Sequence, residues 1–163
     1  MFIKPDYNLK NIYELPIQEL KDANIKAILL DLDSTVMVSK SGKYLPETLK
    51  WFEEVKKDFK LAIVTNNNNP NYLKMVHEST DFPVITDAKK PKTNGIDEAL
   101  KILGVKREEA IMVGDRPLTD ILAGKNAKMK TALVGSINAE NEDFLVKFVR
   151  NLERITIKNN LLK

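Results

Sequence analysis

Short apolar runs, each bounded by polar residues, recur along the chain at intervals that leave room for a helix between them. The first run, 27–32, is too short for a free-standing helix and too continuously apolar for a strand with one face in water. It therefore predicts a strand buried on both faces. Similar runs follow, and together they predict five strands. The four later strands are expected at 61–64, 82–86, 110–115 and 131–135.

Apolar residues at helical spacing fill much of the sequence between these strands. Helices are expected at about 46–57, after Pro70, from 93 or 94 to 103, from about 121, and from about 141 to 154. Alternation of strands and helices predicts a mostly parallel, five-stranded sheet joined by right-handed crossovers. The expected fold class is therefore α/β, a Rossmann-like three-layer sandwich.

The segments outside this alternation are predicted from local signals. Residues 1–26 carry apolar positions at roughly helical intervals. This pattern predicts a helical segment packed outside the sheet or, alternatively, one that rests on a membrane surface. Residues 36–43 are expected to form a small hairpin or flap with a glycine turn. The helix at 46–57 is expected to bury Leu49, with Trp51 at the edge of its apolar stripe. No large cap domain fits between the first two strands.

The length and composition of the chain limit the number of domains and the kinds of bond and metal site that it can form. At 163 residues the chain is expected to form a single domain over 1–163, in which 27–155 is the catalytic core and 156–163 is a tail. The sequence has no cysteine and one histidine, His77. Disulfides and thiolate chemistry are thus excluded, and any bound metal is expected to have oxygen ligands.

The charge balance limits the expected partners. Lys and Arg number 26 against 23 Asp and Glu, which gives a net charge of +3. This mild excess permits an anionic substrate or an anionic membrane surface, whereas nucleic acid usually requires a denser basic stripe. No run approaches the ~18 apolar residues of a membrane span, and the N-terminus is too brief for a secretory signal. A cytoplasmic location is expected, with peripheral contact to a membrane left open.

The predicted strands end in polar residues that suit metal or phosphate binding. These residues are, in chain order, Asp31 and Asp33, Thr65 and Asn66, Lys90, and Asp115 and Asp120. Because the carboxyl ends of parallel strands lie at one edge of a sheet, we expect these side chains to share a site. Carboxylates can converge there on one cation, while hydroxyl, amide and ammonium groups donate to a phosphate.

Each residue also has an explanation that requires no function. Asp33 can begin a turn through hydrogen bonds to its own backbone, and Asp120 can stabilise a helix as a charge near its N-terminus. The asparagines at 68–69 are typical of a loop and a helix cap, and a lysine such as Lys90 is more often a solvated surface group. His77 has no evident partner and is expected at the surface or in packing. The joint placement of the polar strand ends favours the functional interpretation.

Taken in order, the strand ends resemble the four motifs of the haloacid dehalogenase superfamily of phosphatases. The motifs stand here as Asp31-Leu32-Asp33-Ser34-Thr35, Thr65-Asn66, Lys90-Pro91 and Gly114-Asp115-Arg116-Pro117-Leu118-Thr119-Asp120. The resemblance covers roughly residues 1–155. It is greatest for the capless YqeG-type branch of subfamily IIIA, which is similar to phosphatidylglycerophosphatases.

The resemblance implies a role for each acidic residue. Asp31 is expected to attack phosphorus and form an aspartyl-phosphate, and Asp33 to protonate the leaving alcohol and then activate water. Mg²⁺ is expected to bind Asp31, the backbone carbonyl of Asp33, and Asp115, with waters completing the octahedron. Asp120 is expected to reach the metal through a water molecule or to hydrogen-bond to its ligands.

The remaining motif residues are expected to bind the phosphate. Thr65, Asn66 and Lys90 would hold its equatorial oxygens during transfer. The resemblance implies a phosphate-ester substrate, and an open site suits a bulky anionic phospholipid such as phosphatidylglycerophosphate. Two alternatives stay open: a phosphatase for a soluble sugar or nucleotide phosphate, and a non-catalytic phospho-acceptor or partner-binding α/β module.

Overall fold

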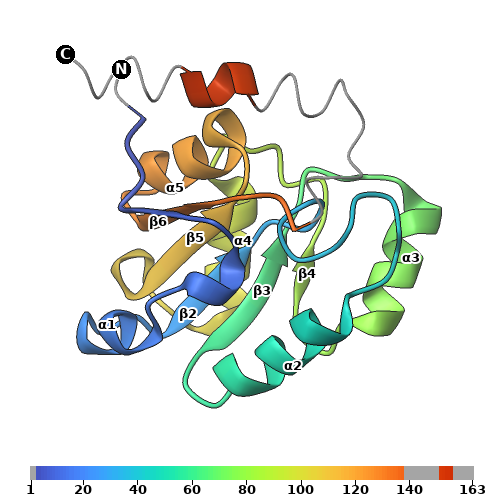
Figure 1. Cartoon of the computed structure of the whole chain (residues 1–163), viewed down its shortest axis with the longest axis horizontal. Helices are drawn as coiled ribbons and strands as arrows, with labels where there is room; N and C mark the ends of the chain where they lie inside the picture. The colour runs from blue at the N-terminus through green and yellow to red at the C-terminus, as the bar shows by residue number, and fades with distance from the viewer. Residues whose placement is uncertain (1–2, 138–150, 156–163) are drawn as a thin grey trace.

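A six-stranded sheet in which all neighbouring strands are parallel forms the centre of the computed structural model, which describes residues 3–137 and 151–155 (Figure 1). The strands in spatial order are β1 (Tyr7–Leu9), β6 (Lys130–Val134), β5 (Ala110–Gly114), β2 (Ala27–Leu30), β3 (Lys60–Val64) and β4 (Val84–Ile85). From β2 the chain continues to β3 and β4 on one side, and then crosses to β5 and β6 on the other. Ligand sites of such sheets lie beyond the carboxyl ends of the strands at this reversal.

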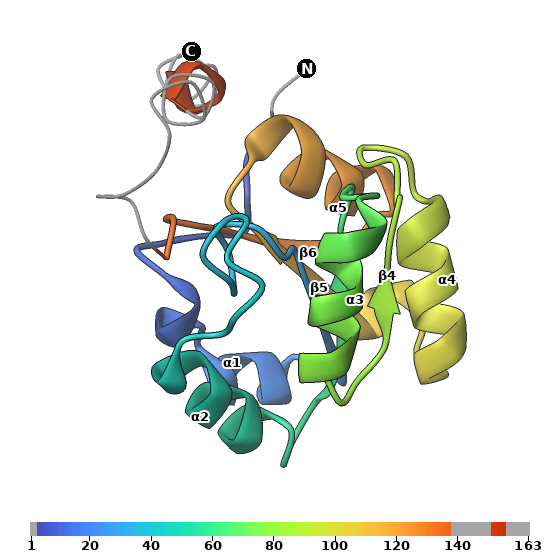
Figure 2. The ribbon, with the colours of Figure 1, turned by 90° about the vertical axis from the view of Figure 1, so that its right-hand side faces the viewer.

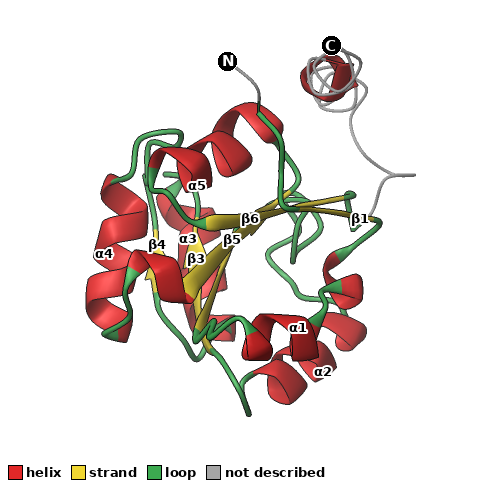
Figure 3. Ribbon diagram, turned by 90° about the vertical axis from the view of Figure 1, so that its left-hand side faces the viewer, coloured by secondary structure: helices red, strands yellow, loops and turns green. Residues whose placement is uncertain are grey.

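Helices cover both faces of the sheet, which is the middle of three layers (Figures 2 and 3). One face carries α1 (Ile17–Asp22), α2 (Pro46–Val55) and α3 (Pro70–Ser79), and the other carries α4 (Asn94–Leu103) and α5 (Leu122–Asn126). Side chains alternate along β2 between the two cores, with Ile28 and Leu30 in the first and Ala27 and Leu29 in the second. The predicted α/β three-layer sandwich is confirmed.

Helix ends follow local sequence signals. Pro70 is the first residue of α3, and the Asn69 side chain accepts hydrogen bonds from the backbone N–H groups of Asn71 and Tyr72. Helix α4 ends at Gly104, whose φ of 67° lies in the left-handed region. The named elements also include the short turns η1 (Ile12–Glu14), η2 (Arg107–Glu109) and the π-helical η3 (Pro117–Ile121).

The sheet has one strand more than the five that the sequence predicts. Strand β1 lies within the segment 1–26 and pairs with β6, with Tyr7 opposite Ala132. Asp6 fixes this pairing, since its carboxylate accepts hydrogen bonds from the backbone N–H and the hydroxyl of Thr131 at 2.8 and 3.1 Å. Three residues are too few to show a period, so this strand depends on its tertiary partner. The helical prediction for this segment is right only for η1 and α1.

Two local predictions differ from the structure. Leu49 is 46% exposed, whereas Trp51 is 7% exposed and takes an inward position on α2, so the prediction for these two residues is wrong. Residues 36–43, predicted as a hairpin or a flap with a glycine turn, form a loop with Gly42 at a φ of 69° and one isolated bridge between Asp33 and Met37. The hairpin alternative is therefore wrong.

Part of the C-terminal prediction lies outside the described residues. Of the helix predicted at 141–154, residues 151–154 are described and are helical, whereas the predicted tail at 156–163 is not described. This short helix contacts the domain through Glu153, which accepts a hydrogen bond from Arg116 at 2.8 Å. Among the helices that the structure describes, none has the length and apolar character to cross a membrane.

Candidate active site

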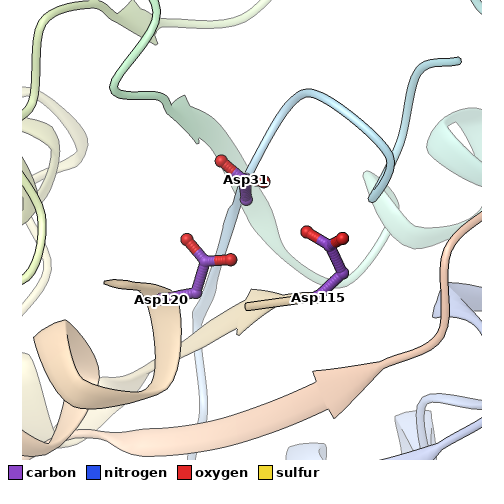
Figure 4. A group of neighbouring side chains, drawn as sticks. All are labelled: Asp31, Asp115 and Asp120. Atoms are coloured by element: carbon purple, nitrogen blue, oxygen red, sulfur yellow. The ribbon is translucent and has the colours of Figure 1, made fainter. Parts of the chain in front are cut away.

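Three of the acidic side chains predicted to share a site converge at the carboxyl edge of the sheet (Figure 4). Asp31 and Asp115 follow the adjacent strands β2 and β5, and the N–H of Asp31 donates to the carbonyl oxygen of Val113. Asp120 lies in the η3 turn. One carboxylate oxygen from each of the three lies within 4.8 Å of the other two. Carboxylates at this spacing can bind one cation.

A buried lysine joins two of these carboxylates. The Nζ atom of Lys90 lies 2.7 Å from Oδ1 of Asp31 and 2.6 Å from Oδ1 of Asp120, and the Lys90 side chain is 1% exposed. Burial opposes the charge of Lys90, but Asp120 and Asp31 outweigh this effect and raise its pKa. Burial, reinforced by the charge of Asp31, raises the pKa of Asp120 to about 6. Lys90 is thus a fixed cation within the acidic cluster.

The hydroxyl of Thr35 lies between the two strand-end carboxylates. Its Oγ1 is 3.4 Å from Oδ2 of Asp31 and 3.3 Å from Oδ1 of Asp115. Asp31 therefore directs one oxygen toward Lys90 and the other toward Asp115. A single hydroxyl proton does little to offset two carboxylate charges, so this side of Asp31 favours a cation. The sequence places Thr35 in the first motif but does not indicate this contact.

Asp120 is held against the end of β5. The backbone N–H of Arg116 donates to Oδ2 of Asp120 at 3.1 Å. A Cβ atom on Gly114 would overlap the Asp120 carboxylate. Glycine is therefore required at the last position of β5, because the carboxylate occupies the space of a side chain there.

Asp33 has a different set of contacts from the three clustered carboxylates. The hydroxyl of Tyr72 donates to its Oδ1 at 2.7 Å, and Nδ2 of Asn67 donates to its Oδ2 at 3.2 Å. Tyr72 comes from α3, and Asn67 comes from the loop after β3. The sequence predicts neither contact, although the position of Asn67 directly after Thr65-Asn66 is a usable signal.

The predicted phosphate donors Thr65 and Asn66 both lie at the site. The hydroxyl of Thr65 accepts a hydrogen bond from the backbone N–H of Asn67 at 3.1 Å. The side chain of Asn66 accepts from the backbone N–H of Lys90 at 2.7 Å and donates to its carbonyl oxygen at 3.0 Å. Asn66 therefore ties the end of β3 to the loop that carries Lys90.

An open cavity of about 260 Å³ lies over these groups. It is lined by Asp31, Asp33, Ser34, Ser39, Lys40, Thr65, Asn66, Asn67, Lys90, Asp115, Arg116 and Thr119. Asp120 is absent from this lining and lies beneath it, 1% exposed. The exposed Lys40 and the part-exposed Arg116 add positive charge to a wall that is otherwise rich in carboxylates. His77 is exposed on α3, in agreement with the prediction.

The fold and the cavity together place the candidate site of this α/β domain at the carboxyl ends of its strands. The chain belongs to the haloacid dehalogenase-like hydrolase family, whose sequence model matches residues 6–134. The predicted family is confirmed.

Two relatives align with nearly the full length of the chain. This chain is 33% identical over 153 residues to "Probable phosphatase YqeG" of Bacillus subtilis, and the alignment covers 94% of this chain and 88% of that protein. It is 27% identical over 171 residues to "Phosphatidylglycerophosphate phosphatase 1, chloroplastic/mitochondrial" of Arabidopsis thaliana, and that alignment covers 99% of this chain and 49% of the plant protein. The chain thus spans about half of the plant protein's length.

A solved structure gives an independent comparison of the fold. The crystal structure of the HAD phosphatase from Thermococcus onnurineus matches with a TM-score of 0.57 and 18% identity, and it covers 74% of this chain and 90% of that one. At this identity the likeness supports the fold alone. The family and the Bacillus relative, which aligns with most of both chains, support the assignment of the protein as a phosphatase.

Proposed function

We propose that the protein is a Mg²⁺-dependent phosphomonoesterase that transfers the phosphoryl group to Asp31. The observation that supports this most directly is the close group of Asp31, Asp115 and Asp120, with Lys90 at 2.7 Å from Asp31. Neighbouring positive charge reduces the repulsion between a carboxylate nucleophile and an anionic phosphate. Asp31 also lines the cavity, where an ester can reach it.

The proposed reaction has two steps. In the first, a carboxylate oxygen of Asp31 attacks phosphorus, the bond to the leaving-group oxygen breaks, and the carboxylic acid of Asp33 gives its proton to that oxygen. In the second, water attacks the phosphorus of the aspartyl-phosphate and gives a proton to the Asp33 carboxylate. The bond between phosphorus and Asp31 then breaks, which releases inorganic phosphate and restores both aspartates. The separate contacts of Asp33 suit a group that handles protons beside the nucleophile.

The donor set fits a divalent cation with oxygen ligands. Asp31 and Asp115 would hold the ion through their carboxylates and Asp33 through its backbone carbonyl, whereas Asp120, whose Oδ1 contacts Lys90, would reach it through water. The carboxylate group found among the described residues has no nitrogen or sulfur donor, which favours Mg²⁺ over zinc. When bound, Mg²⁺ would offset the negative charge of Asp31 and of the phosphate.

Lys90, Thr65 and Asn66 bind the phosphate in this proposal. The ammonium of Lys90 already lies beside the nucleophile, at 2.7 Å from Asp31, and can contact a phosphoryl oxygen there. Thr65 and Asn66 line the same cavity. Asn66 also fixes the backbone of Lys90, so part of its effect is to keep the ammonium in place.

The proposed substrate is a monoester whose leaving group carries a second negative charge. Lys40 and Arg116 line the cavity, and the backbone N–H of Lys40 lies 3.5 Å from Oδ1 of Asp33, the group that protonates the leaving oxygen. Cationic side chains on the wall of this cavity favour an anionic leaving group. Phosphatidylglycerophosphate, the lipid in the name of the Arabidopsis relative, carries a phosphodiester at this place. Its hydrolysis would require the cavity to approach a membrane surface.

Phosphate release tests this proposal. The purified protein is given phosphatidylglycerophosphate in vesicles, and soluble sugar and nucleotide phosphates, with Mg²⁺ or with EDTA. We expect Mg²⁺-dependent release that is fastest from the lipid. Faster release from a soluble ester would favour the soluble substrate class. A phospho-acceptor module would instead accumulate phosphoprotein without turnover.

Two variants test the assigned steps with p-nitrophenyl phosphate. Asp31→Asn should abolish release because an amide is a poor nucleophile. Asp33→Asn should slow turnover and let a covalent phosphoprotein accumulate in a rapid-quench experiment. Asp22→Asn, which alters an exposed carboxylate at the end of α1, is the control and should behave like the wild type. Normal release by Asp31→Asn at saturating Mg²⁺ would refute the proposal.

A further inference from the structure

Donors from two segments fix both oxygens of the Asp33 carboxylate. The Tyr72 hydroxyl is 2.7 Å from Oδ1, and Nδ2 of Asn67 is 3.2 Å from Oδ2. These segments, α3 and the loop after β3, are separated along the chain from the loop that carries Asp33. The carboxyl group is therefore held from two directions, and rotation about its side-chain bonds would break at least one of these contacts.

Tyr72 is well suited to hold a group that changes its protonation state. Its residue is 8% exposed and belongs to the core cluster on the α1–α2–α3 face, so packing fixes the position of the ring. A phenol hydroxyl can donate to a carboxylate and can also accept from a carboxylic acid. The hydroxyl also lies 3.2 Å from the sulfur of Met37, a weak acceptor, so Asp33 is the stronger partner.

We propose that Tyr72 is a positioning residue that, with Asn67, holds the carboxyl group of Asp33 in the orientation for proton transfer to the leaving group. The inference rests on the proposed function and adds a residue outside the four sequence motifs. Orientation matters at this step because a proton is transferred efficiently only over hydrogen-bond distance and in a suitable direction. Without the hydroxyl, Asp33 retains Asn67 and the longer 3.5 Å contact from the backbone N–H of Lys40, but its carboxyl group gains rotational freedom.

A second tyrosine in the same core provides a matched control. Tyr44 is 9% exposed and belongs to the same core cluster. Its hydroxyl contacts Oγ1 of Thr80 at 2.7 Å, and Tyr44 does not line the cavity. Replacement of either tyrosine by phenylalanine removes one hydroxyl group from the same core, but only Tyr72→Phe removes a contact to Asp33.

The test compares two leaving groups through kcat/KM, which reports the steps up to phosphoryl transfer. Glycerol phosphate has a poor leaving group that needs a proton, whereas p-nitrophenolate leaves without one. General acid catalysis contributes about 10²- to 10⁴-fold, so partial loss of orientation in Tyr72→Phe should lower kcat/KM for glycerol phosphate by about tenfold or more. The value for p-nitrophenyl phosphate should change by less than about threefold, and Tyr44→Phe should leave both values within about twofold of the wild type.

Two further variants separate positioning from folding. Asn67→Ala leaves the core intact and should give the same dependence on the leaving group. In an Asp33→Asn background, Tyr72→Phe should cause no additional loss, because a residue that acts through Asp33 has no effect once the carboxyl group is gone.

The inference is overturned if Tyr72→Phe affects both substrates equally, if it matches Tyr44→Phe, or if it lowers activity further in the Asp33→Asn background. Asp31→Asn separates this result from the proposed function. If Asp31→Asn is inactive while Tyr72→Phe behaves like Tyr44→Phe, only the role of Tyr72 fails. If Asp31→Asn keeps full activity, the proposed function fails as well.

Discussion

Replacement of Lys90 by methionine would measure how much the buried ion pairs of Lys90 with Asp31 and Asp120 contribute to stability. The Lys90 ammonium lies 2.7 Å from Asp31 and 2.6 Å from Asp120, inside a region where its side chain is 1% exposed. Methionine keeps much of the apolar stem but removes the charge. Removal of one partner from a buried pair costs about 3–5 kcal/mol, because the other partner stays buried without compensation. We expect a loss of about 4 kcal/mol in the free energy of unfolding at pH 8 in metal-free buffer.

The loss of unfolding free energy in Lys90→Met should grow as the pH rises, because the pKa of Asp120 is raised in the folded protein. In the folded protein this pKa is raised from 3.8 to about 6, so the folded protein holds the Asp120 proton more tightly than the unfolded chain does. The stability linked to this proton is fully present below pH 3.8 and is lost as the pH rises through about 6. Lys90 lowers the pKa of Asp120. The Lys90→Met variant should therefore have a still higher Asp120 pKa, and its free energy of unfolding should continue to fall at pH values above 6. The difference between variant and wild type should therefore be smaller at pH 5 than at pH 8.

Urea unfolding at pH 5 and pH 8 with EDTA, followed by the fluorescence of Trp51, measures this difference. Lys56→Met is a matched control, because Lys56 also contacts two carboxylates, at 2.6 Å from Glu53 and 2.8 Å from Asp81. Those partners are 72% exposed. Exposed pairs contribute about 0–1 kcal/mol, so the control should lose less than about 1 kcal/mol at either pH. Equal losses in the two variants, or a Lys90→Met loss that is the same at both pH values, would refute the reasoning.

Four other perturbations have defined outcomes. Gly114→Ala should cost about 1–3 kcal/mol and lower activity, because the added Cβ displaces Asp120; an unchanged Tm would contradict this. Asp115→Asn should raise the Mg²⁺ concentration for half-maximal activity by at least about tenfold, and an unaltered Mg²⁺ titration would exclude Asp115 as a ligand. Lys40→Glu should lower kcat/KM by about tenfold for esters with a second negative charge but much less for p-nitrophenyl phosphate, and equal effects on both would remove its role in selectivity. Asp6→Asn should lower the free energy of unfolding by about 1–2 kcal/mol in urea, since an amide oxygen accepts more weakly; wild-type stability would show that β1 needs no such anchor.

The sequence predicts the central sheet and the convergence of Asp31 with Asp115 because both follow from simple geometry. The apolar runs that become β2, β3 and β5 are buried on both faces, so their composition alone distinguishes them from half-exposed strands. Once these strands are parallel, their carboxyl ends lie at one edge, and the residues that follow them meet. No knowledge of side-chain packing is needed for this step.

The contacts among the side chains are less accessible from the sequence because they depend on loop conformation. The loop that carries Lys90 includes Asp87 and Lys89 at φ values of 48° and 56°, which residues with a side chain seldom adopt. A local pattern does not indicate such values, so the ion pairs of Lys90 with two carboxylates and its bonds to Asn66 appear only in three dimensions. The contact between Tyr72 and Asp33 is hidden for a similar reason, because an apolar stripe on a helix predicts burial of a tyrosine ring but not the partner of its hydroxyl.

The pairing of β1 with β6 has a practical consequence for handling the protein. Without residues up to Leu9, backbone N–H and C=O groups along one side of 131–134 would lose their partners. An open, apolar strand edge of this kind readily recruits strands from other molecules. Truncated forms of the protein that lack part of Tyr7–Leu9 should therefore self-associate and precipitate even though the cavity residues are intact, so this short strand should be kept when the protein is produced.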